Sequence, residues 1–560
     1  MLSKNGIQKS SGLVTANKSR RKAKLGERDP KALGVGVAGG REATYQPVYV
    51  FIGCSQQSKM DLVVVGSNPT GGFGSCSSAV ERKAKTMQPD WRNEMSTFIN
   101  GLTTNDRRTE NDMPAHSFSG SACLDLFFNL GTRNLGAPEE VRLFSLAFRE
   151  DPQTAVKIMF YNRDARQGRG ERDSFRRLLA YLWELGPDAA RLVTPLVPEY
   201  GRWDDLHALM GGRGEISALD TINAGLVAGN GLCAKWTPRK GDVAAKVRRY
   251  LGLTPKAYRK LLVGLTKVVE TPMCAKQWET INYSHVPSKA SMTYAKAFFR
   301  HDEARYKAWR EELKKPKEER DPKVKINVGV LYPHEIVQKL KFGEAYPVEE
   351  AWKALGEMFP TTDEKIIAVC DVSGSMCGLP LEVSVSLGIF LSERLTGPFQ
   401  DMFITFSAQP SLQRLAGDLR SKVEQLENAH WDMNTNLEAV FELIARAAKN
   451  ADPKDVPTHV LILSDMQFDA CVQEPSDNAM QMIDRLFAEQ GLKRPAIVFW
   501  NLRAVSQTMP VKMHQTGAAM VSGFSPSVLK TLINQPSDFT PLGIMKSTLA
   551  DPRYDALNIL

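Results

Sequence analysis

The sequence predicts a chain of two unlike folded parts, a helical part followed by an α/β part. From about residue 119, segments of ten to twenty residues with helical character follow one another between Gly and Pro signals. From residue 361, short apolar runs alternate with helix-like stretches, which is typical of a doubly wound sheet. Because 560 residues exceed a single core, two or three domains are expected. We therefore expect the class α + α/β, with domains at 119–358 and 361–550.

Residues 1–86 differ from the rest of the chain in composition. Gly, Ser, Lys and Arg recur, and the basic run SRRKAKLGERDPK shows no apolar periodicity. Such a segment has too few apolar side chains to form a core, so we expect a mostly disordered basic tail. Residues 87–118 are then expected to form a linker to the helical part.

The helical part contains nine candidate helices. Stacked antiparallel pairs are the economical arrangement, because each pair needs a neighbour to cover its apolar face. An α-solenoid or ring is therefore expected, although no clean repeat is visible. Residues 310–325 are expected to form a charged linker or an exposed helix end. The predicted helices are Pro138–Arg149, Asp151–Tyr161, Arg172–Leu185, Pro187–Glu199, Trp203–Met210, Ile216–Ala228, Lys240–Tyr250, Pro255–Val269 and Val348–Met358.

The α/β part is predicted from the alternation of strand-like and helix-like segments. Its apolar runs are short and rich in Ile, Val and Leu, as in strands that are buried on both faces of a parallel sheet. The predicted strands are 365–370, 401–406, 458–464, 495–500 and 518–522. The predicted helices are 381–395, 437–449, 478–490 and 525–534.

The segment KIIAVCDVSGSM, residues 365–376, is the most informative motif. Its apolar run predicts a buried parallel strand, and open α/β sheets bind ligands at the carboxyl ends of such strands. Asp371, Ser373 and Ser375 follow this strand on a glycine-containing turn. One carboxylate and two hydroxyls suit Mg²⁺, which takes oxygen ligands and keeps several of its waters. Taken alone, a DxSxS segment is equally well read as a solvated turn.

Two later segments offer partners for this turn. Thr435 precedes the predicted helix 437–449, and Asp465 follows the apolar run Thr458–Ser464. In this order, and at strand-end or loop positions, the residues resemble the metal-ion-dependent adhesion site of von Willebrand factor A domains. We therefore predict that one Mg²⁺ or Mn²⁺ is held, directly or through water, by Asp371, Ser373, Ser375, Thr435 and Asp465.

Composition argues against several classes of protein. No run of eighteen or more apolar residues occurs, and the segment MLSKNGIQKSSG has no apolar signal core, so neither membrane spanning nor secretion is expected. Eight cysteines are scattered without a CxxC pair, which argues against a disulfide framework and a zinc site. We expect a cytoplasmic monomer.

The net charge of +9 is unevenly distributed. Residues 361–560 carry 16 Lys and Arg against 23 Asp and Glu, a net of −7, whereas residues 1–360 carry 56 against 40, a net of +16. A basic first part joined to an acidic second part indicates a polyanionic partner for the first, with nucleic acid favoured. The alternative is a basic tail together with ordinary solvated charge.

Basic residues gather in three places in the helical part. The segment 162–177 is a Gly-containing basic loop that can bring guanidinium groups to phosphates, although its arginines can equally pair with neighbouring carboxylates. Two later blocks, 235–260 and 276–289, interleave basic residues with aromatic ones, a pattern that combines phosphate neutralisation with base stacking. The aromatic residues have core packing as their alternative role. The candidate RNA-binding residues are Arg163, Arg166, Arg169, Arg172, Lys235, Trp236, Arg239, Lys240, Arg248, Arg249, His285 and Lys289.

Several of these segments together resemble one known family. RDARQGRGERDSFRRLL, EYGRWDDL, the region from YRKLL to QWETINYSHVPSKA, and the DVSGSM segment look like the Ro autoantigen (TROVE-module) proteins and their uncharacterised plant, large-virus and phage relatives. The resemblance covers about residues 119–550. It implies a ring of HEAT-like helix pairs closed by a von Willebrand A domain. It also implies small noncoding RNA on the basic outer surface and single-stranded ends of defective RNAs in the central hole.

These observations favour an RNA-binding protein that is not an enzyme. No Walker loop, nucleophile triad or pair of catalytic carboxylates stands out, and one metal without a positioned base is a poor catalyst. The expected ligand is small noncoding or misfolded RNA. The alternative is a protein-interaction adaptor whose metal site captures a carboxylate of a partner protein.

Overall fold

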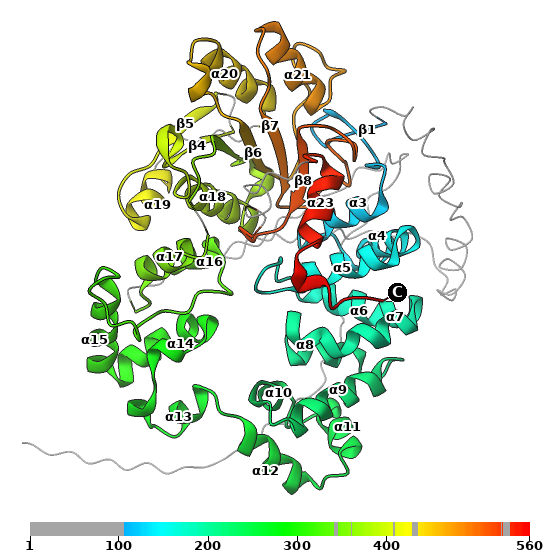
Figure 1. Cartoon of the computed structure of the whole chain (residues 1–560), viewed down its shortest axis with the longest axis vertical. Helices are drawn as coiled ribbons and strands as arrows, with labels where there is room; N and C mark the ends of the chain where they lie inside the picture. The colour runs from blue at the N-terminus through cyan, green and yellow to red at the C-terminus, as the bar shows by residue number, and fades with distance from the viewer. Residues whose placement is uncertain are drawn as a thin grey trace, which may run out of the picture. The chain divides into compact units, whose positions relative to one another are not determined.

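The computed structural model describes residues 106–340, 345–359, 361–406, 409–427, 435–527, 529 and 538–559. Residues Asp90–Leu560 form one compact unit. The described part contains many helices followed by a six-stranded mixed sheet, so the expected class α + α/β is confirmed at that level (Figure 1). The predictions for residues 1–105 and for most of the helix 525–534 fall outside the described residues.

The helical part consists of short helices joined by turns and loops (Figure 1). Short 3₁₀ segments lie between them at Thr194–Leu196, Trp203–Leu209, Trp278–Thr280 and Tyr283–His285. The α-helices are α3 (Ala122–Leu130), α4 (Ala137–Glu150), α5 (Pro152–Arg163), α6 (Asp173–Leu185), α7 (Pro187–Val193), α8 (Val197–Tyr200), α9 (Glu215–Val227), α10 (Gly231–Trp236), α11 (Asp242–Tyr250), α12 (Pro255–Leu265), α13 (Glu270–Cys274), α14 (Ser288–His301), α15 (Glu303–Lys314), α16 (Pro333–Leu340) and α17 (Val348–Gly356).

Side-chain caps explain where several of these helices begin. Ser121, Asp151 and Thr254 each accept a hydrogen bond from a backbone N–H in the first turn of α3, α5 and α12 respectively. Such caps satisfy one of the donors that a helix start leaves unpaired. The predicted helix Pro187–Glu199 is divided into α7, a 3₁₀ turn and α8, because Pro195 and Pro198 have no N–H for a continuous helix.

The α/β part is built on a six-stranded sheet with the order β5-β4-β3-β6-β7-β8. β5 is antiparallel to β4, and the other neighbouring pairs are parallel. The strands are β3 (Ile366–Cys370), β4 (Met402–Thr405), β5 (Ser411–Arg414), β6 (His459–Ser464), β7 (Ala496–Asn501) and β8 (Ala518–Ser522). The helices are α18 (Leu379–Ser392), α19 (Leu419–Glu427), α20 (Leu437–Lys449), α21 (Ala479–Glu489) and α23 (Pro541–Leu549). Short 3₁₀ segments lie at Gly374–Met376, Gly397–Phe399, Pro453–Asp455 and Pro552–Tyr554.

Four strands, β3, β6, β7 and β8, are buried almost along their whole length, which explains their unbroken apolar sequences. All five residues of β3 and all five of β8 are buried, and only the first residue of β6 and of β7 is partly exposed. Strands covered on both faces read as continuous hydrophobic runs. β5, by contrast, is an exposed edge strand, and its polar sequence SLQR carried no strand signal.

Residues 106–116, which we call the strap, lie against the α/β part. They form the two short strands β1 (Arg107–Arg108) and β2 (Pro114–Ala115), which pair with each other. His116 exchanges backbone hydrogen bonds with Met509, and Asp112 bridges to Asp469. This part of the expected linker is therefore structured.

The residues after α23 return to the helical part. The Arg553 guanidinium donates to Asp164 Oδ2 at 2.5 Å, and the Tyr554 hydroxyl donates to the same oxygen at 3.2 Å. Asp164 is fully buried. α3 also packs beside β8 and α23 (Figure 1). The residues after α23 and the helix α3 thus pack the helical part and the α/β part together. No helix among the described residues is long and apolar enough to cross a membrane.

Candidate functional site

The carboxyl ends of β3 and β6 form the centre of the first candidate site. From β3 the chain continues to β4 on one side and later returns to β6 on the other side of β3. The direction in which strands are added to the sheet therefore reverses between β3 and β6. Such a reversal opens the crevice in which open α/β sheets bind ligands. Asp371 directly follows β3 and Asp465 directly follows β6. Two predicted ligands therefore lie at the ends of adjacent strands on either side of this crevice.

Hydrogen bonds fix the Asp371 carboxylate and the turn after it. Ser464 Oγ donates to Asp371 Oδ2 at 2.5 Å, and Ser373 N donates to Asp371 Oδ1 at 2.9 Å. The hydroxyl oxygens of Ser373 and Ser375 are 3.0 Å apart. One carboxylate and two hydroxyls are therefore presented together by this turn. Ser464 contributes to this arrangement but was not among the predicted residues.

The electrostatics of the two carboxylates favour a cation. Asp371 and Asp465 are 0% and 1% exposed. Burial, together with the charge of Asp465, raises the pKa of Asp371 to about 6, and burial also raises the pKa of Asp465. Within the described chain, Asp465 Oδ2 is buried and has no hydrogen-bond partner. Because buried charges of like sign and an unpaired acceptor oxygen are unfavourable, this set of oxygens fits a hard divalent cation.

A cationic side chain from a third strand lies at the same edge. Arg503, two residues beyond β7, donates a hydrogen bond to the backbone oxygen of Ser375. Its charge lowers the pKa of Asp465 and so opposes the effect of burial. Arg503 is 128 positions from Ser375 in the sequence, and no local pattern pointed to it.

Thr435, the remaining predicted ligand, is held by hydrogen bonds in the same group of loops. Its hydroxyl donates to Asp469 Oδ1 at 2.8 Å and accepts from Asn111 Nδ2 at 2.8 Å. Asn111 belongs to the strap and was not predicted to take part. Among the described residues, no group of three or more His, Cys, Asp and Glu side chains is arranged to hold a metal ion. The candidate set thus consists of two carboxylates and several hydroxyls.

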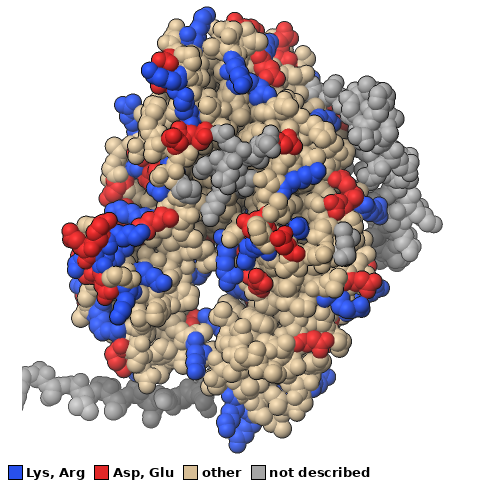
Figure 2. Space-filling model, in the orientation of Figure 1, with Lys and Arg blue, Asp and Glu red and all other residues tan. Residues whose placement is uncertain are grey.

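The second candidate site is a groove of about 850 Å³ in the helical part. Its lining comes from α10, from the segment between α12 and α13, and from the start of α14. On the face drawn in Figure 2, the surface is hollowed, with Lys and Arg side chains at the edge of the hollow. Four residues predicted to bind RNA line the groove: Lys235, Trp236, His285 and Lys289.

The groove lining carries more positive than negative charge. Arg202, Lys267 and the predicted lysines line it together with one carboxylate, Glu270. Lys235 Nζ lies 3.0 Å from Glu270 Oε1, and Lys289 pairs with Glu335. Lys267 is exposed. Sequence reasoning missed Arg202 and Lys267, because neither lies in a run of basic residues.

The arginines of the loop 163–172 are divided between the interior and the surface. Arg163 is 3% exposed and its Nε lies 2.7 Å from Asp205 Oδ2, whereas Arg169 is 1% exposed. Arg166 and Arg172 are exposed; Arg166 donates to the backbone oxygen of Glu199, and Arg172 pairs with Asp173. The loop therefore presents two of its four predicted guanidinium groups to solvent.

The remaining predicted basic residues lie beside the groove or on α11. Arg239 is exposed and donates to the hydroxyl of Thr266, which lines the groove. Lys240 is exposed as well. Arg248 and Arg249 bond backbone oxygens of Leu253 and Ala245 and do not line the groove. The structure thus brings four of the predicted RNA-binding residues into one groove and places Arg239 next to it.

Comparison with known proteins matches both parts of the chain to domains of unknown function. The domain DUF2828 covers residues 109–209 and 221–365, and the domain DUF7788 covers residues 365–541. Uncharacterized protein L728 of Acanthamoeba polyphaga mimivirus is 31% identical over 503 residues, which span 79% of this chain and 86% of the viral protein. This chain belongs to the family of protein L728. Within this L728-like chain, the two domain matches meet at Lys365, directly before β3. Asp371 and Asp465 lie in the second matched domain, whereas Asn111 lies in the first.

Proposed function

We propose that this protein binds RNA through its helical part and holds one divalent cation at the sheet edge of its α/β part. The RNA is small noncoding or misfolded RNA with a single-stranded segment. In this proposal the architecture is similar to that of Ro proteins, with HEAT-like helix pairs and a von Willebrand A domain. The observation that carries the proposal is the convergence of Lys235, Trp236, His285 and Lys289 on one groove.

The chemistry of the groove suits single-stranded RNA. Lysine and arginine side chains can neutralise phosphates, while the half-buried Trp236 offers a ring on which a base can stack. The exposed His285 can form hydrogen bonds with a base edge or a 2′-hydroxyl. The net charge of +16 on residues 1–360, against −7 on residues 361–560, favours attraction of a polyanion to the helical part.

The cation would be held by Asp371, Ser373, Ser375 and Asp465, with Thr435 acting directly or through water. Bound there, Mg²⁺ or Mn²⁺ would neutralise the two carboxylates and keep an exchangeable coordination position. Two observations support this part of the proposal: Asp465 Oδ2 has no hydrogen-bond partner among the described residues, and the pKa of Asp371 is raised. The role of the protein is to hold oxygen ligands at fixed positions and to bury them.

A protein-interaction adaptor is the second candidate function. In that case the cation would bind a carboxylate of a partner protein at its exchangeable position. The strap bears on this alternative, because its Asn111 bonds Thr435 and the loop after β6. These contacts place the strap next to the proposed cation site. RNA binding is preferred because four of its predicted residues line one groove.

The experiment compares two charge reversals in the full chain. Lys267→Glu changes an exposed groove residue, and Lys493→Glu makes the same change at an exposed position between α21 and β7. Filter binding of a single-stranded RNA is measured over a range of salt concentrations. Lys267→Glu should weaken binding and flatten the slope of log affinity against log salt by about 0.7, as one lost phosphate contact does. Equal RNA affinity and equal slope in the two variants and the wild type would contradict the proposed groove.

A further inference from the structure

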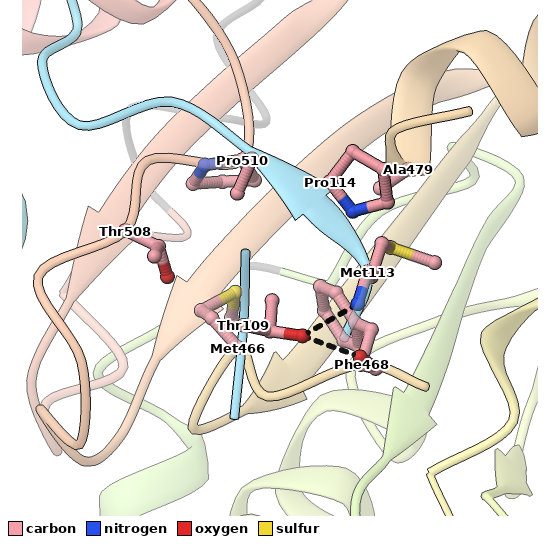
Figure 3. A pocket seen from close by; sticks show the side chains of 9 residues that line it. Thr109, Met113, Pro114, Met466, Phe468, Ala479, Thr508 and Pro510 are labelled. Atoms are coloured by element: carbon pink, nitrogen blue, oxygen red, sulfur yellow. Dashed lines mark hydrogen bonds between the residues drawn. The ribbon is translucent and has the colours of Figure 1, made fainter. Parts of the chain in front are cut away.

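The strap packs closely on the loop that follows β6, as Figure 3 shows from close by. Thr109 Oγ1 donates to the backbone oxygen of Phe468 at 2.7 Å and accepts from Met113 N at 3.0 Å. Met113 and Met466 line the cavity between strap and loop, which measures only about 10 Å³. Such a space is too small for anything larger than a single water. The strap is therefore a packed part of the sheet edge.

Hydrogen bonds connect the middle of the strap to the candidate cation site. Glu110 N donates to Gln467 Oε1 at 2.8 Å, and Asn111 Nδ2 donates to Gln467 O at 2.9 Å. Gln467 in turn donates through Nε2 to the backbone oxygen of Asp465 at 3.2 Å. Asn111 Nδ2 also donates to Thr435 Oγ1. The loop after β6 and Thr435, which precedes α20, thus fix the backbone of the strap at Glu110 and Asn111.

The carboxylate of Glu110 belongs to the same electrostatic environment as the buried carboxylates. Glu110 N bonds the side chain of Gln467, which follows Asp465 by two residues and donates to its backbone oxygen, so this strap residue lies beside Asp465. Asp465 Oδ2 lacks a hydrogen-bond donor among the described residues. Glu110 itself is exposed, so its side chain is free to turn toward an ion. A strap residue therefore adds negative charge at a place where two buried carboxylates already repel each other.

We propose that Glu110 is an internal ligand of the cation site and completes, directly or through one water, the coordination of the ion held by Asp371 and Asp465. A carboxylate oxygen is a preferred ligand of Mg²⁺ and Mn²⁺. This inference rests on the proposed cation site and extends it. Glu110 takes the coordination position that a partner's acid would otherwise occupy. The ion then ties the strap to the sheet edge, and the docked strap closes the site to outside carboxylates.

The test is a Mn²⁺ titration of the full chain by calorimetry. Glu110→Gln removes the proposed ligand at an exposed position, so folding should be preserved. Glu474→Gln is the matched control, because Glu474 is an exposed acid in the loop between β6 and α21. Glu110→Gln should weaken Mn²⁺ binding by at least about tenfold, the loss expected when a group that supports a metal site is removed. Glu474→Gln should bind Mn²⁺ like the wild type.

Hydrogen exchange of the strap amides gives a second readout that does not depend on affinity. In the wild type, Mn²⁺ should slow exchange at the amides of residues 109–113, and in Glu110→Gln a saturating concentration of Mn²⁺ should protect them less. Wild-type affinity together with wild-type protection in Glu110→Gln overturns the inference. If Asp371→Asn then still abolishes Mn²⁺ binding, the cation site itself stands. Absence of Mn²⁺ binding in the wild type overturns both the site and the inference.

Discussion

The guanidinium carbon of Arg202 lies 3.9 Å from the centre of the Trp236 ring. Arg202 is held by the carboxylate of Asp204, which also pairs with Arg176. Arg176 in turn pairs with Asp205, the buried partner of Arg163. An ion network that begins in the interior thus fixes a cation against the tryptophan of the groove. The ring is therefore oriented before any ligand binds, which lowers the entropy cost of stacking.

Trp236→Ala should weaken binding of single-stranded RNA by about 1–3 kcal/mol, the usual loss for one stacked base. The slope of log affinity against log salt should change little, because no phosphate contact is removed. Fluorescence anisotropy at several salt concentrations measures both quantities, and Trp236→Phe serves as a control that keeps an aromatic face. A lowered melting temperature with unchanged RNA affinity would instead make Trp236 a packing residue.

Asp371→Asn should abolish the stabilisation of the protein by Mg²⁺. A ligand that binds only the folded state raises the free energy of unfolding, by about 2.7 kcal/mol at one hundred times its dissociation constant. The melting temperature of the wild type should therefore rise with Mg²⁺, and that of the variant should not. Asp363→Asn, at an exposed position before β3, is the matched control and should respond like the wild type. An equal Mg²⁺ response in wild type and Asp371→Asn would argue against the cation site.

Arg169→Met should leave RNA affinity unchanged, because the side chain is only 1% exposed. Its guanidinium lies 4.3 Å from the Phe127 ring centre, and none of its nitrogens has a hydrogen-bond partner in the described part of the chain. Burial lowers the pKa of Arg169 to about 10. Because a buried charge without a carboxylate partner is costly, the variant should be as stable as the wild type or more stable in urea unfolding. Loss of RNA affinity at unchanged stability would support the original prediction that Arg169 contacts RNA.

The stability of the protein should decrease between about pH 4 and pH 7 through Asp125. Burial raises the pKa of Asp125 to about 7 from the ordinary value of 3.8. In this window the folded state keeps a proton that the unfolded state has released, so raising the pH favours unfolding. The loss is at most about 4 kcal/mol. Asp125→Asn can still accept the hydrogen bond from Ser119 N, and it should flatten the pH dependence of urea unfolding. Parallel pH profiles of wild type and variant would rule out this contribution.

Much of the fold followed from local patterns. α20 and β8 have their predicted bounds, because α20 has a strong helical periodicity of apolar residues and β8 is a short, continuous buried run. β5 was missed because its stability comes from pairing with β4, and its own sequence is polar. α23 was missed for a different reason, since a short helix within a mixed sequence has little periodicity to detect. The strap was taken as a linker because its partners lie more than 320 residues away.

Some of the candidate site residues could likewise be predicted from local patterns, whereas others depend on contacts between distant segments. The motif around Asp371 could be found because a strand followed by DxSxS is a local signal, and strand order then brings Asp465 to the same edge. Arg503 and Asn111 reach this edge only through contacts between distant segments. In the helical part, the block around Trp236 was visible as alternating basic and aromatic residues. Whether an arginine such as Arg163 faces solvent or a buried Asp205 depends on packing that the sequence pattern does not contain.

The contact between Arg553 and Asp164 bears on the order in which this chain acquires its structure during synthesis. Asp164 is fully buried, and the residues that neutralise it and bond to it are translated 389 and 390 positions later. Until they arrive, the Asp164 carboxylate has the Arg166 N–H as a donor but no cationic partner. It is then either buried as an unneutralised charge, at a cost of several kcal/mol, or still hydrated in an open structure. The helical part, which is synthesised before the α/β part, is therefore completed late, and it depends in the meantime on remaining soluble while partly open.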